Sequence, residues 1–210
     1  MSANDPKFVP SSEGEVMRLV IENPLAWVVS FAERDYCATP LPLRPVLDAG
    51  QRITGLQGHF ARSNRHVELL RRAPRAVLLF MGPHGYVSPS WMTDRTQAPT
   101  WNYATVQFLV DIELIDEAAE LDAVVRDLIG AMEAGRPRAW SADDMGARYR
   151  SLSRGIIGFR ARIVSRRAKF KLGQDEREDV YADIVGGLEA NGMDELREWM
   201  RRSNPSRRAP

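Results

Sequence analysis

The 210-residue sequence predicts an α+β, mainly β fold: an antiparallel β-barrel, closed or split, with peripheral helices and a helical carboxyl terminus. The first indication is a series of short apolar runs, rich in β-branched and aromatic residues and separated by turn residues. The second is that helical segments interrupt these runs without the regular strand–helix alternation of a doubly wound sheet. About six strands, joined mostly by short turns, are typical of a barrel.

The expected strands begin with Leu25–Phe31, which is rich in β-forming residues and ends at a charged turn. The segment Tyr36–Leu47 is expected to return as the second strand of a hairpin. Its prolines cannot donate hydrogen bonds to a neighbouring strand, so this segment is confined to a sheet edge or to a break in pairing. Further strands are expected at Ile53–Phe60, Ala76–Met81, Thr105–Ile115 and Gly155–Ser165.

The first helix is expected to start at a capping box, because Ser12 and Glu15 have the spacing at which each satisfies a free backbone N–H. Asn23-Pro24 should end it, since the residue before a proline avoids the helical conformation. A second capping box is expected at Asp175 and Glu178. The other helices are expected after Ser63, over 116–135, over 141–153 and after Asp194.

The segment Gly82–Tyr103 is expected to be a long loop between two strands. Loops of this length are usually functional or disordered, and disordered segments are poor in aromatic residues. This segment contains two tryptophans and two tyrosines. It is therefore expected to pack against something flat, either a planar cofactor or a partner subunit.

Three stretches carry a resemblance to a known family. The sequences LQGHFARSN, GPHGYVSPSW and PTWNY resemble those of the PaiB-type FMN-binding negative transcriptional regulators. That family belongs to the split-barrel flavoproteins, which include pyridoxamine-phosphate oxidases. The resemblance implies FMN as cofactor, a homodimer and a split-barrel domain over residues 1–172. Residues 173–210 are then expected to form a helical extension with a basic tail.

The segment His59–Asn64 is a candidate phosphate site, because it lies where a strand turns into a helix. A helix amino terminus offers free N–H groups and a partial positive charge, which attract phosphate. Arg62 adds a guanidinium, Ser63 a hydroxyl and Asn64 an amide, and His59 is a further donor. In the resembling family this segment is expected near the FMN phosphate. The alternative is that Ser63 only caps a helix and that Arg62 is a solvated side chain.

Two further stretches are candidate walls for the isoalloxazine ring. In split-barrel flavoproteins the strand that corresponds to Thr39, Leu41 and Leu43 runs past the ring and contacts it largely through backbone groups. Trp91 and Trp101 either stack beside the ring, form a dimer contact or fill the core. Ser88 and Ser90 are expected as hydroxyl donors to a ligand or as turn residues.

The sequence assigns no catalytic residue and no metal site. The three histidines, His59, His66 and His84, have no recognised metal-ligand spacing. Cys37 has no histidine nearby in the sequence, so an ordinary buried thiol is expected. The alternative function is a flavin-dependent oxidoreductase of the pyridoxamine-phosphate oxidase type.

Charge and hydropathy limit the possible partners. The net charge of +1 is low for a dedicated nucleic-acid module. DNA remains possible only through a local patch, either Arg160–Lys171 or the arginine tail, and a solvated face balanced by acidic helices is the alternative there. No apolar run is long enough for a transmembrane helix. A single cysteine and the lack of a signal-peptide pattern favour a cytoplasmic location.

Overall fold

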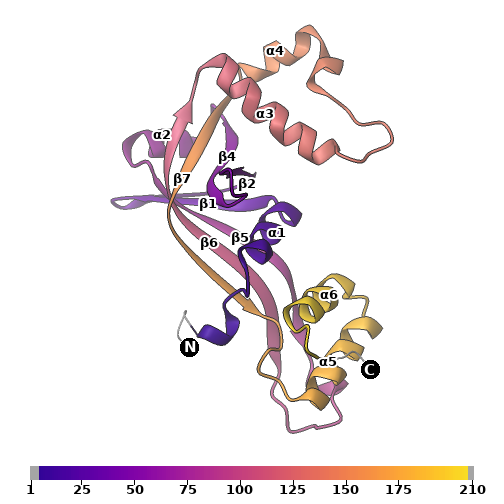
Figure 1. Cartoon of the computed structure of the whole chain (residues 1–210). Coiled ribbons are helices and arrows are strands. Elements are labelled where there is room, and N and C mark those ends of the chain that lie inside the picture. Colours follow the sequence, from indigo (N-terminus) through magenta and orange to yellow (C-terminus); the bar gives the residue numbers. More distant parts are fainter. Residues whose placement is uncertain (1–4, 208–210) are drawn as a thin grey trace. The chain divides into compact units, whose positions relative to one another are not determined.

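The structure, a computed structural model, describes residues 5–207 and confirms the α+β split-barrel fold. Its seven described strands form one antiparallel sheet in the order β2-β1-β5-β6-β7-β4-β3 (Figure 1). The strands are β1 (Leu25–Ala32), β2 (Asp35–Pro42), β3 (Arg44–Leu47), β4 (Ile53–Ala61), β5 (Arg75–Val87), β6 (Thr100–Ile115) and β7 (Ile156–Lys171). The helices are α1 (Glu13–Glu22), α2 (Arg65–Arg72), α3 (Ala118–Glu133), α4 (Ala147–Ser153), α5 (Glu178–Ala190) and α6 (Asp194–Ser203).

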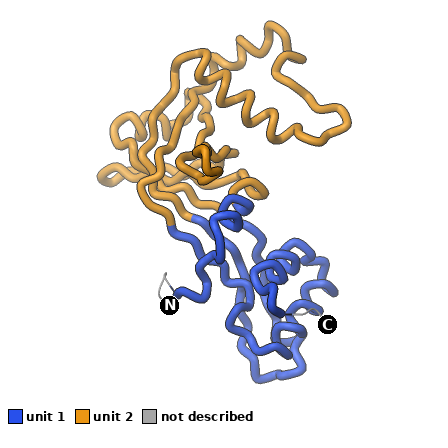
Figure 2. The backbone as a smooth tube through the Cα atoms, in the orientation of Figure 1, with its two compact units in different colours: residues 1–19, 81–106, 167–210 blue, residues 20–80, 107–166 orange. Residues whose placement is uncertain are grey.

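The chain divides into two compact units, which Figure 2 colours separately. Unit 1 comprises residues 1–19, 81–106 and 167–210, and unit 2 comprises residues 20–80 and 107–166. Strands β5, β6 and β7 each contribute residues to both units. The independent helical extension expected beyond Leu172 stays a prediction.

The prolines of the segment 36–47 lie at sheet edges, as predicted, but this segment forms two strands instead of one. β2 pairs with β1 at one end of the strand order, whereas β3 pairs with β4 at the other end. Leu43 separates them: its side chain is fully buried and its N–H donates to the Pro24 carbonyl oxygen at 2.8 Å. Pro42 and Pro45 offer no N–H on either side of this break. One continuous strand was therefore the wrong expectation.

Unit 2 is held together by a core between β4, β7 and α2. Phe60 packs against Phe159 with ring centroids 5.1 Å apart. Leu43 fills the space above Gly58, where a β-carbon would lie 2.8 Å from the Leu43 side chain. β2 and β4, first and sixth in the strand order, are in contact without pairing. The sheet therefore curls toward closure around these side chains without becoming a continuous barrel.

The long loop is shorter than expected, because β5 continues to Val87 and β6 already begins at Thr100. Residues 82–87 were predicted as loop from their two glycines and one proline, and that was wrong. Gly85 has a packing role instead: a β-carbon there would lie 2.1 Å from the Met193 side chain. The missing side chain lets α6 approach the strand closely.

Three helix starts differ from the prediction in detail. Ser12 accepts a hydrogen bond from the Glu15 N–H, as expected, but the Glu15 carboxylate accepts from the Ser11 N–H. Asn64, not Ser63, caps α2 by accepting from the His66 N–H. Arg177 occupies the cap of α5, because Asp175 is paired with Lys7 at 3.2 Å instead. Which residue caps a helix thus depends on the contacts that its side chain makes in the fold, and not only on its spacing in the sequence.

Helix α5 packs directly on the indole of Trp91 in unit 1. A β-carbon at Gly187 would lie 2.5 Å from the six-membered ring of Trp91, whereas one at Gly186 would meet nothing within 4 Å. Both glycines lie inside the same helix. Replacing each of them by alanine therefore separates the effect of helix propensity on stability from the effect of packing against Trp91.

We expect Gly187→Ala to destabilise unit 1 by about 1–3 kcal/mol, because overpacking against a rigid ring exceeds the gain in helix propensity. Gly186→Ala is the matched control and should stabilise α5 by about 0.5–1 kcal/mol. Urea unfolding followed by tryptophan fluorescence measures both changes. Equal effects of the two substitutions would contradict the packing of α5 on Trp91.

Candidate functional site

The end of β4 sends its side chains to two opposite faces. His59 lies opposite Gly158 of β7 and shares its face, on which a β-carbon at Gly158 would approach Leu121 of α3 and Ile115. Phe60 points to the other face and contacts the His66 ring at 5.1 Å between centroids. Burial lowers the pKa of His59, whose Nδ1 is buried without a hydrogen-bond partner in the described chain. His59 therefore belongs to the side of the sheet that α3 covers.

Arg62 is occupied by two groups of the same chain. Its Nη2 lies 2.5 Å from the Asp116 carboxylate, and its Nε donates to the Arg154 carbonyl oxygen at 3.0 Å. The hydrogen bond from Arg62 is the main reason that the pKa of Asp116 is lowered. The guanidinium thus ties the end of β4 to the start of α3 and to the residue before β7. It would have to leave Asp116 to reach a phosphate at the helix start.

A second cluster gathers around the fully buried side chain of His66, on α2. The His66 Nδ1 lies 2.9 Å from the Thr39 hydroxyl of β2, and its Nε2 lies 2.9 Å from the Ser30 hydroxyl of β1. The Asn64 amide reaches the same Thr39 hydroxyl at 3.5 Å. Burial lowers the pKa of His66 from 6.5 to about 4, so the ring is neutral at pH 7. The structure therefore brings Thr39 and Asn64, both predicted site residues, to one place.

The start of α2 leaves donors free for an anion. Within the described residues, the Ser63 hydroxyl and the backbone N–H groups of Ser63 and Arg65 have no hydrogen-bond partner. Ser63 is exposed and Asn64 is half-buried. Free N–H groups at a helix start, together with a hydroxyl, fit a phosphate group. The residues present thus suit the phosphate of FMN, with direct donors from Ser63 and Arg65.

Thr39, Leu41 and Leu43 were expected on one strand beside the isoalloxazine ring. In the structure, the first two are half-buried and Leu43 is in the core. Thr39 and Leu41 share one face of β2 and are half-buried. Leu43 lies outside β2, and its side chain is in the core and its N–H is occupied. A flavin contact at Leu43 would therefore involve its carbonyl oxygen.

The opposite face of β1 and β2 is apolar and exposed, which sequence reasoning did not anticipate. We call it the hairpin face. Its large side chains are between 50% and 66% exposed: Leu25, Trp27 and Phe31 on β1, and Tyr36 on β2. The register pairs Trp27 with Pro40 and Phe31 with Tyr36. Alternating aromatic residues in LAWVVSF were the signal, because every second residue of a strand shares a face.

The other candidate residues lie in unit 1. They are two serines in a turn, one packed tryptophan and one exposed tryptophan. Ser88 and Ser90 hydrogen-bond each other through their hydroxyls at 2.7 Å, which is the turn role. Trp91 packs on Gly187, as described above. Trp101 is a β6 residue rather than part of the loop; its indole is 54% exposed and meets the Tyr86 ring edge-on at 6.0 Å.

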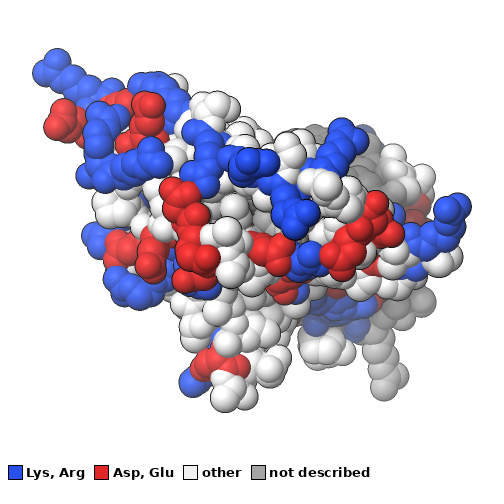
Figure 3. Space-filling view, turned by 90° about the horizontal axis from the view of Figure 1, so that it is seen from above, with Lys and Arg blue, Asp and Glu red and all other residues white. Residues whose placement is uncertain are grey.

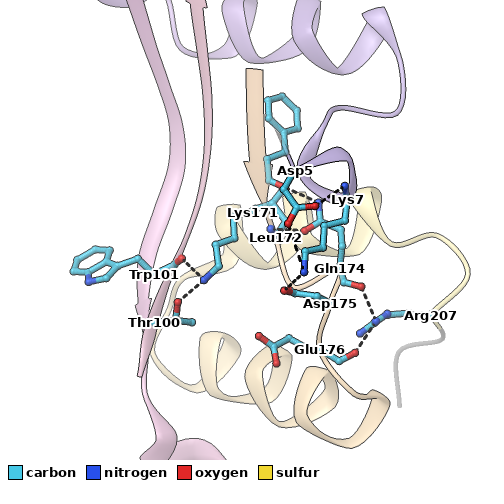
Figure 4. A network of polar contacts seen from close by, with 11 residues as sticks. Asp5, Lys7, Thr100, Trp101, Lys171, Leu172, Gln174, Asp175, Glu176 and Arg207 are labelled. Atoms are coloured by element: carbon cyan, nitrogen blue, oxygen red, sulfur yellow. Dashed lines mark hydrogen bonds and ion pairs between the residues drawn. The ribbon is translucent and has the colours of Figure 1, made fainter. Parts of the chain in front are cut away.

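A polar network in unit 1 supports the backbone beside Trp101 (Figure 4). Lys171 Nζ contacts the Thr100 hydroxyl and donates to the Trp101 carbonyl oxygen at 3.2 Å, while the indole points away. Burial lowers the pKa of Lys171. Nearby, Arg207 donates to the backbone carbonyl oxygens of Gln174 and Glu176. This network orders the chain and leaves the Trp101 ring free for a ligand or partner.

Comparison with known proteins identifies the family. A family model described as "Putative FMN-binding domain" matches residues 4–165. The chain belongs to this family of FMN-binding domains. It is an FMN-binding split-barrel protein, related to the PaiB type.

The relatives extend over most of the chain. It is 29% identical, over 87% of its length and 86% of the relative's, to the protease synthase and sporulation protein PAI 2 of Bacillus subtilis. The FAD and heme binding protein from Mycobacterium smegmatis has a TM-score of 0.56 at 19% identity, covering 84% of this chain and 78% of that one. For the flavocytochrome Anf3 from Azotobacter vinelandii the TM-score is 0.55 at 18% identity, with 79% and 71% covered. These two structures show the shared fold.

Residues 5–207 contain neither a metal-binding group nor a membrane-spanning helix. No group of three histidine, cysteine or carboxylate side chains there is arranged to hold a metal ion. No helix in this range is long and apolar enough to cross a membrane.

The basic stretch Arg160–Lys171 is largely paired with acidic or aromatic groups. Arg160 lies 2.6 Å from Glu120, and Arg162 lies 2.5 Å from Asp111. Lys169 lies over the Phe8 and Tyr103 rings. Acidic and basic side chains are intermingled on the face that Figure 3 shows. This arrangement is that of the balanced, solvated face. In the tail, Arg202 pairs with Glu198, and Arg208 lies outside the described residues.

Proposed function

We propose that this protein is a homodimeric, FMN-dependent regulator of the PaiB type. The observation that carries the proposal is that an FMN-binding fold combines a phosphate-sized donor set at the start of α2 with an exposed aromatic face on the adjacent β1–β2 hairpin. The donor set lies beside Thr39 at the start of α2. The hairpin face offers aromatic side chains to a second flat surface.

The FMN phosphate is proposed to bind at the segment His59–Asn64 and the first N–H group of α2. Ser63 supplies its hydroxyl and N–H, Arg65 its N–H, and Thr39 and Asn64 border the same place. The proposed role of Arg62 is to position this segment through Asp116. When bound, the flavin supplies electron-transfer chemistry; the residues of this chain bind and orient it.

The first test of the FMN site is the double variant Thr39→Val/Ser63→Ala. We expect it to bind FMN at least about tenfold more weakly, because the Ser63 hydrogen bond to a charged group is lost and Thr39 no longer holds the start of α2 through His66. Thr54→Val is the matched control: it removes a strand threonine that bonds only the Val46 carbonyl oxygen. Flavin fluorescence titration measures all three proteins, and unchanged affinity in the double variant would exclude the segment.

The variant Asp116→Asn decides the role of Arg62, because the two possible roles predict opposite changes in FMN affinity. If Arg62 positions the segment, Asp116→Asn loosens it and weakens FMN binding. If Arg62 binds the phosphate directly, Asp116→Asn releases the guanidinium and FMN binds as well or more tightly. Arg62→Ala weakens binding in both cases, so only the aspartate variant separates them.

The homodimer is proposed to bury two surfaces, the hairpin face of unit 2 and the Tyr86–Trp101 pair of unit 1. Exposed aromatic clusters are typical of interface cores, and contiguous apolar patches of this kind mark interaction sites. The second surface adjoins the segment Ser88–Tyr103, which the sequence favoured as ligand or interface. Burial against a partner subunit explains each exposure.

We expect light scattering to give twice the 23.7 kDa chain mass at micromolar concentration with FMN present. Trp27→Asp and, separately, Trp101→Asp should each weaken the dimer by about 100-fold or more, because a charge would be buried without a partner. Val9→Asp is the control, since Val9 is 55% exposed but lies on neither surface. A wild-type monomer would refute the dimer.

Regulation through DNA is proposed to be weak and salt-sensitive for the isolated protein, because Arg160 and Arg162 of the basic stretch are ion-paired and the net charge is only +1. Binding that neutralises several phosphates weakens steeply as salt rises. Gel shifts across a salt series, with and without Arg167→Gln/Lys169→Gln, measure this. Tight binding that survives high salt and both substitutions would show a reading surface elsewhere. No binding at low salt would favour the oxidoreductase alternative.

A further inference from the structure

A cavity of about 660 Å³ lies in unit 2, between α3, α4 and the end of β4. Its walls come from three places that Figure 1 shows adjoining: the start of α3 after β6, helix α4, and the turn before β7. A volume of this size is within the range of small-molecule pockets, about 300–1,000 Å³. Of the proposed phosphate segment, Arg62 lines the cavity, whereas Ser63, Asn64 and the neighbouring Thr39 and Arg65 do not.

One side of the cavity is apolar. Leu121 is buried in a cluster with Ile115, Val124 and Val125, and the Tyr149 ring packs against that cluster. Ala118 and Ala147 add small apolar side chains from the starts of α3 and α4. These residues can accommodate the hydrocarbon or aromatic part of a ligand.

The acidic side chains around the cavity have ion-pair partners, whereas two of its arginines have none among residues 5–207. Asp116 is neutralised by Arg62 at 2.5 Å, and Asp122 by Arg126 at 2.8 Å. Arg150 and Arg154 also line the cavity, and neither guanidinium has an ion pair or hydrogen bond among residues 5–207. The aspartates are thus engaged, and the two free charges at the cavity are positive.

Tyr149 adds an unsatisfied polar group. Its hydroxyl is buried and has no hydrogen-bond partner in the described chain. Burial raises the pKa of this hydroxyl, and the nearby Asp122 carboxylate adds to the rise without meeting the hydroxyl in a bond of normal geometry. A buried group without a partner is costly, so an oxygen of a ligand would relieve that cost.

We propose that this cavity is a second ligand site, separate from the flavin site, which binds a small organic carboxylate with an apolar body. Arg150 and Arg154 bind the carboxylate, because a guanidinium matches its geometry and holds it through charge-assisted hydrogen bonds. The Leu121 side of the cavity, with the Tyr149 ring, covers the apolar body, and the Tyr149 hydroxyl donates to a carboxylate oxygen.

The test is calorimetric titration of the full-length, FMN-saturated protein with sodium octanoate and with sodium 4-phenylbutyrate. We expect saturable binding of one molecule per chain. The double variant Arg150→Gln/Arg154→Gln should bind at least about tenfold more weakly, because it loses the charge-assisted bonds. Arg148→Gln is the matched control: Arg148 is an exposed arginine of the same helix that does not line the cavity.

Three comparisons make the result decisive. Ala147→Phe, which fills the cavity, should abolish binding, and 1-octanol and inorganic phosphate should each bind more weakly than octanoate. FMN affinity should be unchanged in the arginine double variant, which separates this site from the flavin site. The proposal is overturned if neither carboxylate binds or if Arg148→Gln matches the double variant. Phosphate binding as tightly as octanoate, or stoichiometric displacement of octanoate by FMN, would also overturn it.

Discussion

The hydrogen bonds of His66 are the constraint on which the rest of unit 2 depends. A fully buried imidazole joins α2 to β1 through Ser30 and to β2 through Thr39, at 2.9 Å in each case. Leaving either ring nitrogen unpaired in the core would cost a large part of the stability of a small domain. The helix is therefore fixed against the hairpin. The free N–H groups of α2 and the exposed hairpin face are consequently held in fixed positions relative to one another.

The end of β4 serves two functional regions because side chains alternate across a strand. His59 lies on the face under α3, and Arg62 reaches the start of α3 at Asp116. Phe60 points into the core against His66. Three and four residues after Phe60, Ser63 and Asn64 lead into α2, whose His66 contacts Phe60. A single strand end can thus border both the proposed flavin phosphate site and the proposed carboxylate site, which use different donors.

Several charged side chains on β7 have partners within the chain, whereas the apolar side chains of the hairpin face are uncovered within the described residues. Two of the β7 arginines that were candidates for DNA, Arg160 and Arg162, lie against carboxylates, so their field is largely cancelled close to the surface. The aromatic residues of the hairpin face have no such cover within the described chain. Unpaired apolar area, and not unpaired charge, is therefore the main feature that calls for a partner. The cavity beside α4 is the exception, where two arginines remain free.

The sequence by itself determined the fold class, most strand positions and the placement of prolines at sheet edges, because these depend on local propensity and on missing N–H donors. Ser63, taken as a helix cap, also located a helix start, one residue early. Only the tertiary structure decided that residues 82–87 extend a strand, since Gly85 is required by the close approach of α6.

 The tertiary structure also decided which side chains are available. Arg62 was a phosphate candidate by type, but its guanidinium lies 2.5 Å from a carboxylate that is 54 residues away in the sequence. Leu43 was a candidate wall of the flavin site, yet its side chain fills the core above Gly58. Ser30, absent from the sequence-based site, anchors His66. Local spacing determines which element a residue joins, whereas the partners of its side chain depend on contacts between distant segments, which spacing does not encode.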